Sequence, residues 1–352
     1  MKMPDIIQFD LRDLIATTLS EQDGVRLESV GVINTVHRPF SRIIFIRALT
    51  SGGERKLVLK QIVHHSANKS ITDRENQAQV EFLILRELYP KFLNVPGCNV
   101  PRPILVVPEQ DLYIMEFVDG QLLVEMLNGI RLLTRHDSLN RLVEFYRLCG
   151  LWLRKLREFT GVQFASPSIY AVTLERCEQK LNIIDRTADP RCPRNLTERI
   201  RSLIRDQIHR AGDRPPVAGR HGDFGNWNII AGANGITVID FLGYQEDLLP
   251  MDFLKMMTNF EDEKAYLLYS KRTIDALKNG FLAGYGKPPE IALPVALICE
   301  ILHRVCCICA KIENRPQNLM RRIENNISLK HNIAWFLNDN RKSLWPAEAT
   351  LS

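Results

Sequence analysis

Three side chains that can handle protons or metal ions follow one another in the second half of the sequence: Asp223, Asn228 and Asp240. The first two lie in the polar stretch His-Gly-Asp-Phe-Gly-Asn-Trp-Asn, and Asp240 ends a second apolar segment after a tight turn expected at residues 232–235. One carboxylate to take a hydroxyl proton, with an amide and a second carboxylate to hold magnesium on a nucleotide, is the equipment of phosphoryl transfer. The rest of the chain must supply what this stretch lacks.

The composition is that of an ordinary globular protein. The 352 residues are 45% hydrophobic and 25% charged, which suits two packed lobes and is unlike a disordered chain. The net charge of +5 is small for this length and is not gathered in a basic tail. We therefore expect no nucleic-acid partner.

The sequence predicts a cytoplasmic protein with no membrane partner. Its N-terminus carries Asp5 and Asp10 where a secretory signal needs an unbroken apolar core. The most apolar run, residues 291–309, contains Glu300, His303 and Arg304, which would be costly in lipid, so we interpret it as a buried helix. The oligomeric state stays unknown at this level.

The eight cysteines are expected to be reduced thiols, most of them buried. Four are isolated, and the other four lie on one helical run with no second ligand pair at zinc-finger spacing. Free cysteine packs as a small hydrophobe. Neither a disulfide framework nor a zinc site is expected.

The first part of the chain predicts a small antiparallel sheet with two helices. Apolar spacing predicts a leading helix over 5–20 and an amphipathic helix over 72–90, which would begin at Thr72 or Asp73 and stop at Pro90. Apolar runs rich in β-branched residues predict strands over 26–30, 42–49, 56–62, 101–107 and 112–117, with a hairpin turn at 51–54.

Helical periodicity dominates beyond Gly120, so we place the lobe boundary just before it. The prediction is an N-lobe of residues 1–118, with the leading helix, the sheet and one helix, and a helical C-lobe of residues 119–352 that carries the catalytic and metal-binding loop. The C-lobe helices are predicted over 122–127, 138–159, 174–184, 196–210, 262–282, 291–312 and 317–338.

Lys60 lies inside an apolar strand, where a lysine either faces solvent or sits in a cleft with an acidic partner. The residues next to Lys60 in the sequence, taken alone, favour a side chain that faces solvent. Glu81, on the following helix, could reach back to it. The order of a strand lysine, a helix glutamate and then Asp223, Asn228 and Asp240 is more informative than any of these residues alone.

This set resembles the aminoglycoside phosphotransferase and choline kinase group, which has a protein-kinase-like fold. The resemblance rests on His221-Gly222-Asp223 followed by Asn228, and on Ile239-Asp240-Phe241. It extends to residues 58–60, to the helix with Glu81, and to residues 100–103 and 112–120, so it covers about residues 25–255. It implies an α+β bilobal fold with a small antiparallel N-lobe sheet and a larger, mostly helical C-lobe, and it favours a functional Lys60.

The resemblance also implies how a nucleotide would be held. Lys60 would contact the α- and β-phosphates of ATP and be positioned by Glu81, with Glu75 as the competing candidate. The backbone of Glu116 and Val118 would hydrogen-bond adenine. Met115 would line the adenine pocket.

For the reaction itself, the resemblance implies that Asp223 orients and deprotonates the acceptor hydroxyl. Asn228 and Asp240 would bind Mg²⁺. Asp252 resembles the family aspartate that supports the loop, and we interpret it as structural. One departure is the segment 30–39, taken as the connection of the first two strands, which has a single glycine, so no phosphate-covering loop is recognisable.

The leading hypothesis is an ATP-dependent phosphotransferase that moves the γ-phosphate to a hydroxyl of a small metabolite such as a sugar, an aminoalcohol or an aminoglycoside-like compound. Charge in residues 241–352 is nearly balanced, whereas a polycationic aminoglycoside would be better served by an acidic cleft. The alternative is a non-catalytic kinase-like module that binds a nucleotide or a partner. A protein kinase is disfavoured because the glycine-rich loop is missing and Gly222 replaces the usual arginine.

Overall fold

The fold comes from a computed structural model that describes residues 10–38, 40–63, 76–130, 136–187, 189, 191–265, 269–286, 293–314 and 319–337. The chain divides into two compact units. The first contains residues 1–126 and 226–244, and the second contains residues 127–225 and 245–352. The lobe boundary at residues 118/119 stays a prediction.

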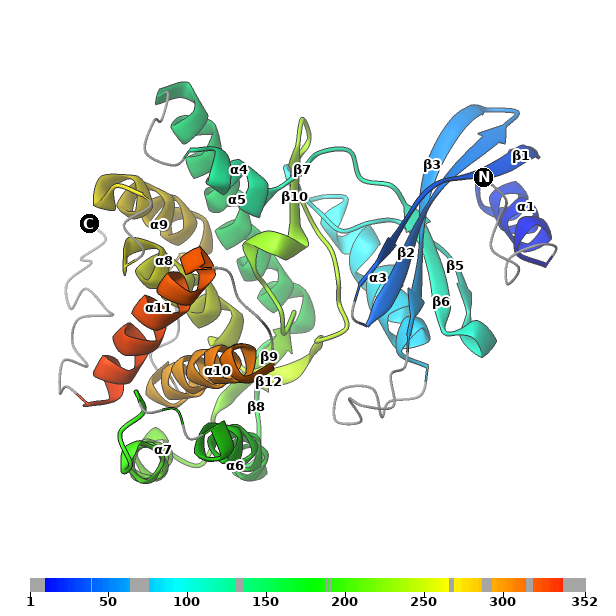
Figure 1. Cartoon of the computed structure of the whole chain (residues 1–352). Coiled ribbons are helices and arrows are strands. Elements are labelled where there is room, and N and C mark those ends of the chain that lie inside the picture. Colours follow the sequence, from blue (N-terminus) through cyan, green and yellow to red (C-terminus); the bar gives the residue numbers. More distant parts are fainter. Residues whose placement is uncertain are drawn as a thin grey trace. The chain divides into compact units, whose positions relative to one another are not determined.

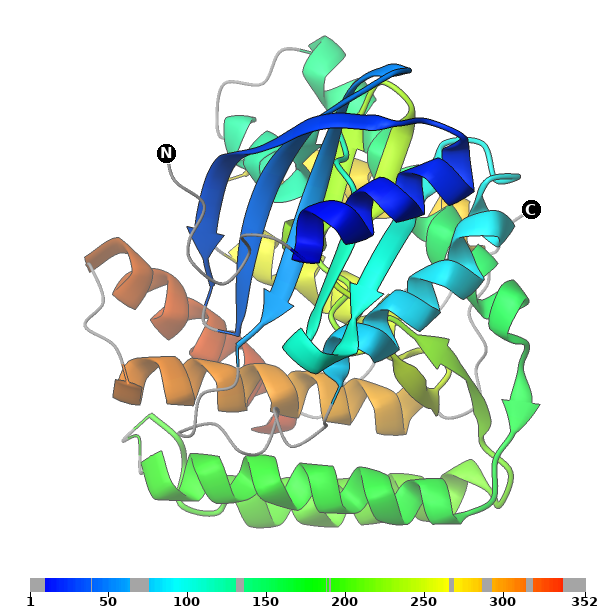
Figure 2. The ribbon, with the colours of Figure 1, turned by 90° about the vertical axis from the view of Figure 1, so that its right-hand side faces the viewer.

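The first unit is built on an antiparallel sheet of the strands β1 (Leu27–His37), β2 (Ser41–Thr50), β3 (Gly53–Ile62), β6 (Leu112–Glu116) and β5 (Pro103–Val107), in that spatial order (Figure 1). Helix α1 (Asp10–Asp23) covers one face (Figure 2). Alternate residues point to this face, where Leu57 and Leu59 pack with Ile15 and Leu19 of the helix. The predicted antiparallel sheet is confirmed.

The other face of this sheet carries the residues with chemistry. Lys60 pairs with Tyr113 and Val58 pairs with Met115, so these four side chains share one face. Helix α3 (Gln77–Phe92) packs on that side.

The predicted stop of α3 at Pro90 is wrong, and its predicted start lies outside the described residues. Pro90 is inside the helix, which ends at Phe92 with the Leu93 N–H bonded to the Tyr89 carbonyl at 3.1 Å. A proline this close to the end removes only one bond from the helix and is tolerated there.

The second small sheet of the first unit is formed by β4 (Cys98–Asn99), β11 (Gly235–Val238), β10 (Ile229–Gly232) and β7 (Gln121–Leu122). Strands β10 and β11 form the predicted hairpin, because Gly232 pairs with Gly235 across a two-residue turn. Gly235 has a φ of 104°, and a Cβ there would lie 2.2 Å from the Gly97 carbonyl oxygen. The hairpin fixes the positions of Asn228 before it and Asp240 after it.

The second unit is mostly helical. Its helices are α5 (His136–Thr160), α6 (Ser168–Thr187), α7 (Leu196–Ala211), α8 (Met251–Ala265), α9 (Lys271–Tyr285), α10 (Leu293–Asn314) and α11 (Leu319–Leu337), and α4 (Leu123–Gly129) spans the division between the units. A short sheet of β8 (Gln163–Phe164), β9 (Pro216–Arg220) and β12 (Gln245–Leu248) completes it. Helices α5 and α9 approach closely, since a Cβ on Gly284 would lie 1.8 Å from the Arg147 carbonyl oxygen.

Two of the predicted elements are wrong. The expected helix over 262–282 is two helices, because α8 ends at Ala265 and the Ser270 hydroxyl caps α9 by accepting the Thr273 N–H at 3.0 Å. The expected connection at 30–39 is mostly strand, since β1 runs to His37 and pairs with β2 from Leu27 to that residue. Strand β1 is lengthened by its pairing with β2, and this long-range contact cannot be recognised in a short window of sequence.

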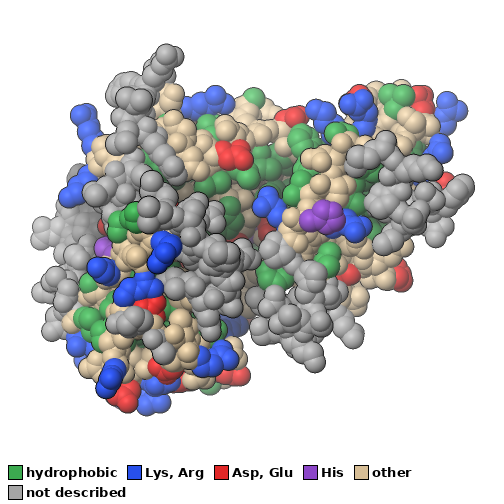
Figure 3. All heavy atoms as spheres, in the orientation of Figure 1, with side chains coloured by type: hydrophobic (Ala, Val, Ile, Leu, Met, Phe, Trp, Pro, Cys, Tyr) green, Lys and Arg blue, Asp and Glu red, His purple; other side chains and the backbone are tan. Residues whose placement is uncertain are grey.

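The cysteines are all free thiols, and six of the eight are buried, as predicted. No helix in the described part of the chain is long and apolar enough to cross a membrane. In the view of Figure 3, acidic side chains lie among the basic ones on each unit, so the described surface on this face has no extended area of one sign.

Candidate active site

The centre of the first unit is a buried ion cluster around Lys60. Its ammonium nitrogen donates to the two Glu81 carboxylate oxygens at 3.0 and 2.8 Å and to Asp240 Oδ1 at 2.7 Å. Glu81 is fully buried, and its Oε1 also accepts the Phe241 backbone N–H at 2.7 Å. The predicted contact of Lys60 with Glu81 is therefore present, while Glu75 lies outside the described residues.

This cluster holds Lys60 in the charged form. Burial by itself lowers the lysine pKa, but the negative charges of Glu81 and Asp240 and the hydrogen bonds to them outweigh burial, so the pKa is raised. Burial raises the Glu81 pKa, against the lowering effect of Lys60 and the Phe241 N–H. The result is a fixed positive charge inside the unit, close to the exposed part of Asp240.

Tyr113 extends the same cluster and was missed by the sequence reasoning. Its phenol is fully buried, and burial followed by the charges of Glu81 and Asp240 raises its pKa well above the ordinary value. Tyr113 pairs with Lys60 across strands β3 and β6, and this pairing is the feature that could have identified it as a neighbour of the lysine. Tyr113 therefore stays neutral and adds no charge to the cluster.

The expected adenine-binding segment follows β6. Met115 is buried on the face that carries Lys60. The Glu116 N–H already donates to the Arg102 carbonyl at 2.9 Å, and the next N–H, of Phe117, donates to the Lys56 carbonyl at 3.0 Å. The Glu116 carbonyl and the Val118 N–H are therefore the backbone groups that could meet a base.

The end of the hairpin brings together the two predicted metal ligands. The Ile239 N–H donates to the Asn228 carbonyl at 2.9 Å, so Asn228 lies beside the residue that precedes Asp240. Asp240 has a left-handed φ of 69°, a costly conformation for a residue other than glycine. The Asp240 side chain is 40% exposed.

This donor set fits Mg²⁺. Mg²⁺ takes oxygen ligands and is commonly held by one or two protein side chains together with substrate phosphates and water. Asp240 and Asn228 offer a carboxylate and an amide oxygen, and the described residues contain no cluster of three or more His, Cys, Asp or Glu side chains that would suit a softer metal.

The second unit holds Asp223 in a loop with several supports. The Asp252 carboxylate accepts the backbone N–H groups of His221 at 2.5 Å and Gly222 at 3.1 Å, which confirms its predicted structural role. The buried His221 ring accepts the Asp223 N–H at its Nδ1, 3.3 Å away. Phe224 is buried and stacked on Trp152, with ring centroids 5.5 Å apart. The loop geometry is therefore set before any ligand binds.

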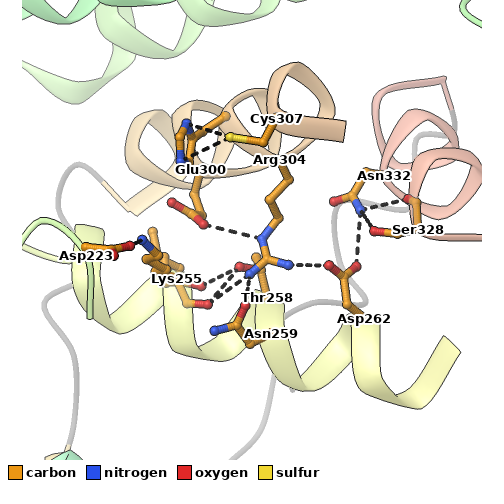
Figure 4. A network of polar contacts seen from close by, with 12 residues as sticks. Asp223, Lys255, Thr258, Asn259, Asp262, Glu300, Arg304, Cys307, Ser328 and Asn332 are labelled. Atoms are coloured by element: carbon orange, nitrogen blue, oxygen red, sulfur yellow. Dashed lines mark hydrogen bonds and ion pairs between the residues drawn. The ribbon is translucent and has the colours of Figure 1, made fainter. Parts of the chain in front are cut away.

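The Asp223 carboxylate itself is held by a lysine that the sequence did not reveal. Lys255 of α8 donates from Nζ to Asp223 Oδ1 at 2.5 Å (Figure 4). The lysine side chain is 10% exposed and the aspartate side chain 44%. Only one oxygen of Asp223 accepts a bond from Lys255, and much of the side chain is exposed. The carboxylate can therefore still accept a proton from a bound hydroxyl.

Helix α10 fixes the helix that carries Lys255. Arg304 reaches from α10 to α8, where it contacts Asp262 and Asn259 and donates to the Lys255 carbonyl at 3.1 Å (Figure 4). Glu300 accepts from the same guanidinium at 3.3 Å. This network joins two helices across a gap of more than forty residues and so holds the Lys255 backbone in place.

His303 on α10 gives a testable pH dependence. Burial, followed by the positive charges of Lys180, Lys255, Arg220 and Arg304, lowers its pKa to about 3. The folded protein keeps His303 neutral while the unfolded chain binds a proton below about pH 6.5. Stability attributable to this residue is therefore complete above pH 6.5 and is lost as the pH falls toward 3, by about 2 kcal/mol at pH 5.

The measurement is urea unfolding at pH 7.5 and pH 5.0 for wild type and His303→Gln. The variant should lose about 2 kcal/mol less than wild type between the two pH values. His331→Gln, at an exposed position of α11, is the matched control and should behave as wild type. An unchanged pH dependence in His303→Gln would contradict the assignment.

The arrangement of an antiparallel sheet with Lys60, Glu81 on the next helix, and Asp240 after a hairpin defines the class of protein-kinase-like phosphotransferases. The model of the phosphotransferase enzyme family matches residues 46–291, so the chain belongs to this family. No curated protein sequence matches it.

Solved structures agree on the fold. A glucosamine kinase is similar with a TM-score of 0.56 at 12% identity, over 94% of this chain and 100% of that one. A choline kinase from Cryptosporidium parvum Iowa II gives a TM-score of 0.51 at 13% identity, over 90% and 92% of the two chains. An amicoumacin kinase gives 0.51 at 11% identity, over 90% of each chain. The predicted α+β protein-kinase-like fold is confirmed.

Proposed function

We propose that the protein is an Mg²⁺- and ATP-dependent phosphotransferase that moves the γ-phosphate to a hydroxyl group of a small molecule. The observation that carries this proposal is the buried Lys60, held by Glu81 at 2.8 Å and bonded to Asp240 at 2.7 Å. A buried lysine that stays charged beside a partly exposed aspartate is suited to nucleotide phosphates. Two solved structures of the same fold hold AMP-PNP or ADP.

In this proposal the first unit binds the nucleotide. Lys60 contacts the α- and β-phosphates and Glu81 keeps it in position, while Met115 lines the adenine pocket and the backbone of Glu116 and Val118 bonds the base. Asn228 and Asp240 hold Mg²⁺, which when bound neutralises phosphate charge.

The second unit supplies the group that activates the acceptor. Asp223 accepts the proton of the acceptor hydroxyl, and the hydroxyl oxygen forms a bond to the γ-phosphorus. The bond from that phosphorus to the bridging oxygen breaks, and its electron pair leaves with ADP. The reaction requires Asp223 within hydrogen-bond reach of a hydroxyl that faces the γ-phosphate. Lys255 keeps the carboxylate in one orientation.

The proposal is tested with purified wild-type protein. Calorimetry measures binding of Mg-ATP, and ADP release is followed with sugars, aminoalcohols and aminoglycosides as acceptors. We expect binding, transfer to at least one compound, and loss of transfer when EDTA removes the metal. Absence of both nucleotide binding and ATP hydrolysis would contradict the proposal, whereas binding without hydrolysis or transfer would favour a non-catalytic module. The cytoplasmic location stays a prediction.

A further inference from the structure

The second unit contains a cavity of about 170 Å³ beside the loop that carries Asp223. Gly222 of that loop and Lys255, which bonds Asp223, both line it. The remaining walls come from α6, β9, β12, α8 and α10. The cavity therefore lies next to Asp223, the residue proposed to take the hydroxyl proton, and is lined by its chain neighbour Gly222 and its ion-pair partner Lys255.

The lining is rich in positive charge. It contains four basic side chains, Arg176, Lys180, Arg220 and Lys255, and two carboxylates, Asp247 and Glu300. A cavity with this excess attracts anions and repels a polycation such as an aminoglycoside.

The two carboxylates are already occupied by partners of the protein. Asp247 is buried and accepts from Arg176 at 2.7 Å, from Arg220 at 2.9 Å and from the Leu248 N–H at 2.8 Å. Glu300 accepts from Arg304, which is not part of the lining. Both oxygens of Asp247 are therefore engaged, and one oxygen of Glu300 is engaged by Arg304.

Two hydrogen-bond donors of basic side chains, the Lys180 ammonium and the Arg220 Nε–H, remain without an acceptor in the described part of the chain. Lys180, half-buried on α6, makes no ion pair or hydrogen bond there. The Nε–H of Arg220 is buried and has no hydrogen-bond acceptor there, although the guanidinium bonds Asp247 through Nη1. The Arg220 guanidinium, which lines the cavity, therefore has hydrogen-bonding capacity beyond its ion pair with Asp247.

The size of the cavity limits the occupant. Its volume of about 170 Å³ is close to that of an engineered cavity of about 150 Å³ that binds benzene. One six-membered ring or a smaller compound fits, and a compound of several rings would extend outside.

We propose that this cavity receives the acceptor of the phosphoryl transfer, and that the acceptor is a hydroxyl compound of at most one ring that bears a carboxylate or phosphate group recognised by Lys180 and Arg220. The inference rests on the proposed function. Its hydroxyl loses the proton to Asp223 as the oxygen bonds the γ-phosphorus and ADP leaves. The anionic group is held near Arg220, which ends β9 three residues before Asp223.

The first experiment compares four probes with one ring size and different charge. Glucose, glucosamine, glucuronate and glucose 6-phosphate are titrated into the wild-type protein in the presence of Mg-ADP, and ADP release is measured with Mg-ATP. We expect an anionic probe to bind at least about tenfold more tightly than glucose. The glucuronate and phosphate arms show which anion the cavity prefers. Tighter binding of glucosamine, or no advantage for either anion, would overturn the inference.

The second experiment replaces Lys180, the basic residue of the lining that has no ion pair in the described part of the chain. Lys180→Ala should weaken binding of the favoured anionic probe roughly tenfold and leave glucose binding, Mg-ATP affinity and the melting temperature unchanged, because Lys180 makes no ion pair or hydrogen bond in the described part of the chain. Lys180→Arg should recover most of the affinity. Lys330→Ala, at an exposed position of α11, is the matched control. Equal anion affinity in wild type and Lys180→Ala would overturn the inference.

The two proposals fail in different ways. Loss of Mg-ATP binding and of all ATP turnover would count against the proposed function. Turnover with neutral or cationic acceptors, together with Mg-ATP binding, would leave the proposed function standing and overturn only the anionic acceptor.

Discussion

Replacing Asp223 by asparagine is expected to lower kcat by a factor of roughly 10² to 10⁴, the usual contribution of a general base. The amide keeps the shape of the side chain but cannot take the hydroxyl proton. Mg-ATP affinity should stay within about a factor of two, because the groups proposed to bind it belong to the first unit and the lost interaction is realised mainly in the transition state.

The experiment on Asp223 needs a control for stability, since the change removes the negative partner of Lys255. Asp206→Asn, at an exposed position of α7, is the matched replacement and should leave both kcat and stability unchanged. Circular dichroism and urea unfolding of both variants separate a folding defect from a catalytic one. A folded Asp223→Asn protein with kcat within tenfold of wild type would remove this residue from the mechanism.

Replacing Lys60 by methionine is expected to have the largest combined effect on binding and stability. The change removes the proposed phosphate contact and leaves the fully buried Glu81 with the Phe241 N–H as a remaining donor. Breaking a buried ion pair from one side costs about 3–5 kcal/mol. We expect a loss of unfolding free energy of that order and a large fall in Mg-ATP affinity, measured by urea unfolding and calorimetry.

A second substitution separates these two effects. The double variant Lys60→Met/Glu81→Gln removes the uncompensated charge, so most of the lost unfolding free energy should return while ATP binding stays impaired. Lys56→Met, on the exposed part of the same strand, controls for the change of residue type. If the double variant recovered ATP binding together with stability, the lysine would be structural only.

Much of the first unit could be predicted from the sequence alone, because its strands and turns follow from local patterns of residues. Alternation along β3 and β6 decides which side chains share a face, and this places Lys60 with Met115. The turn at 232–235 sets the hairpin between Asn228 and Asp240. Helix α3 packs on the face of the sheet that carries Lys60, and this brings Glu81 into contact with Lys60.

Only the tertiary structure decided what surrounds Asp223. Lys255 of α8 and Arg220 of β9 contact residues of other elements, and Lys180 lines the same cavity from a third element, α6. Periodicity records which side of an element is buried, but it does not say which charged side chains of distant segments meet. Ion pairs and cavities are made by packing across long sequence separations, so the cavity proposed to select the acceptor could not be predicted from the order of residues.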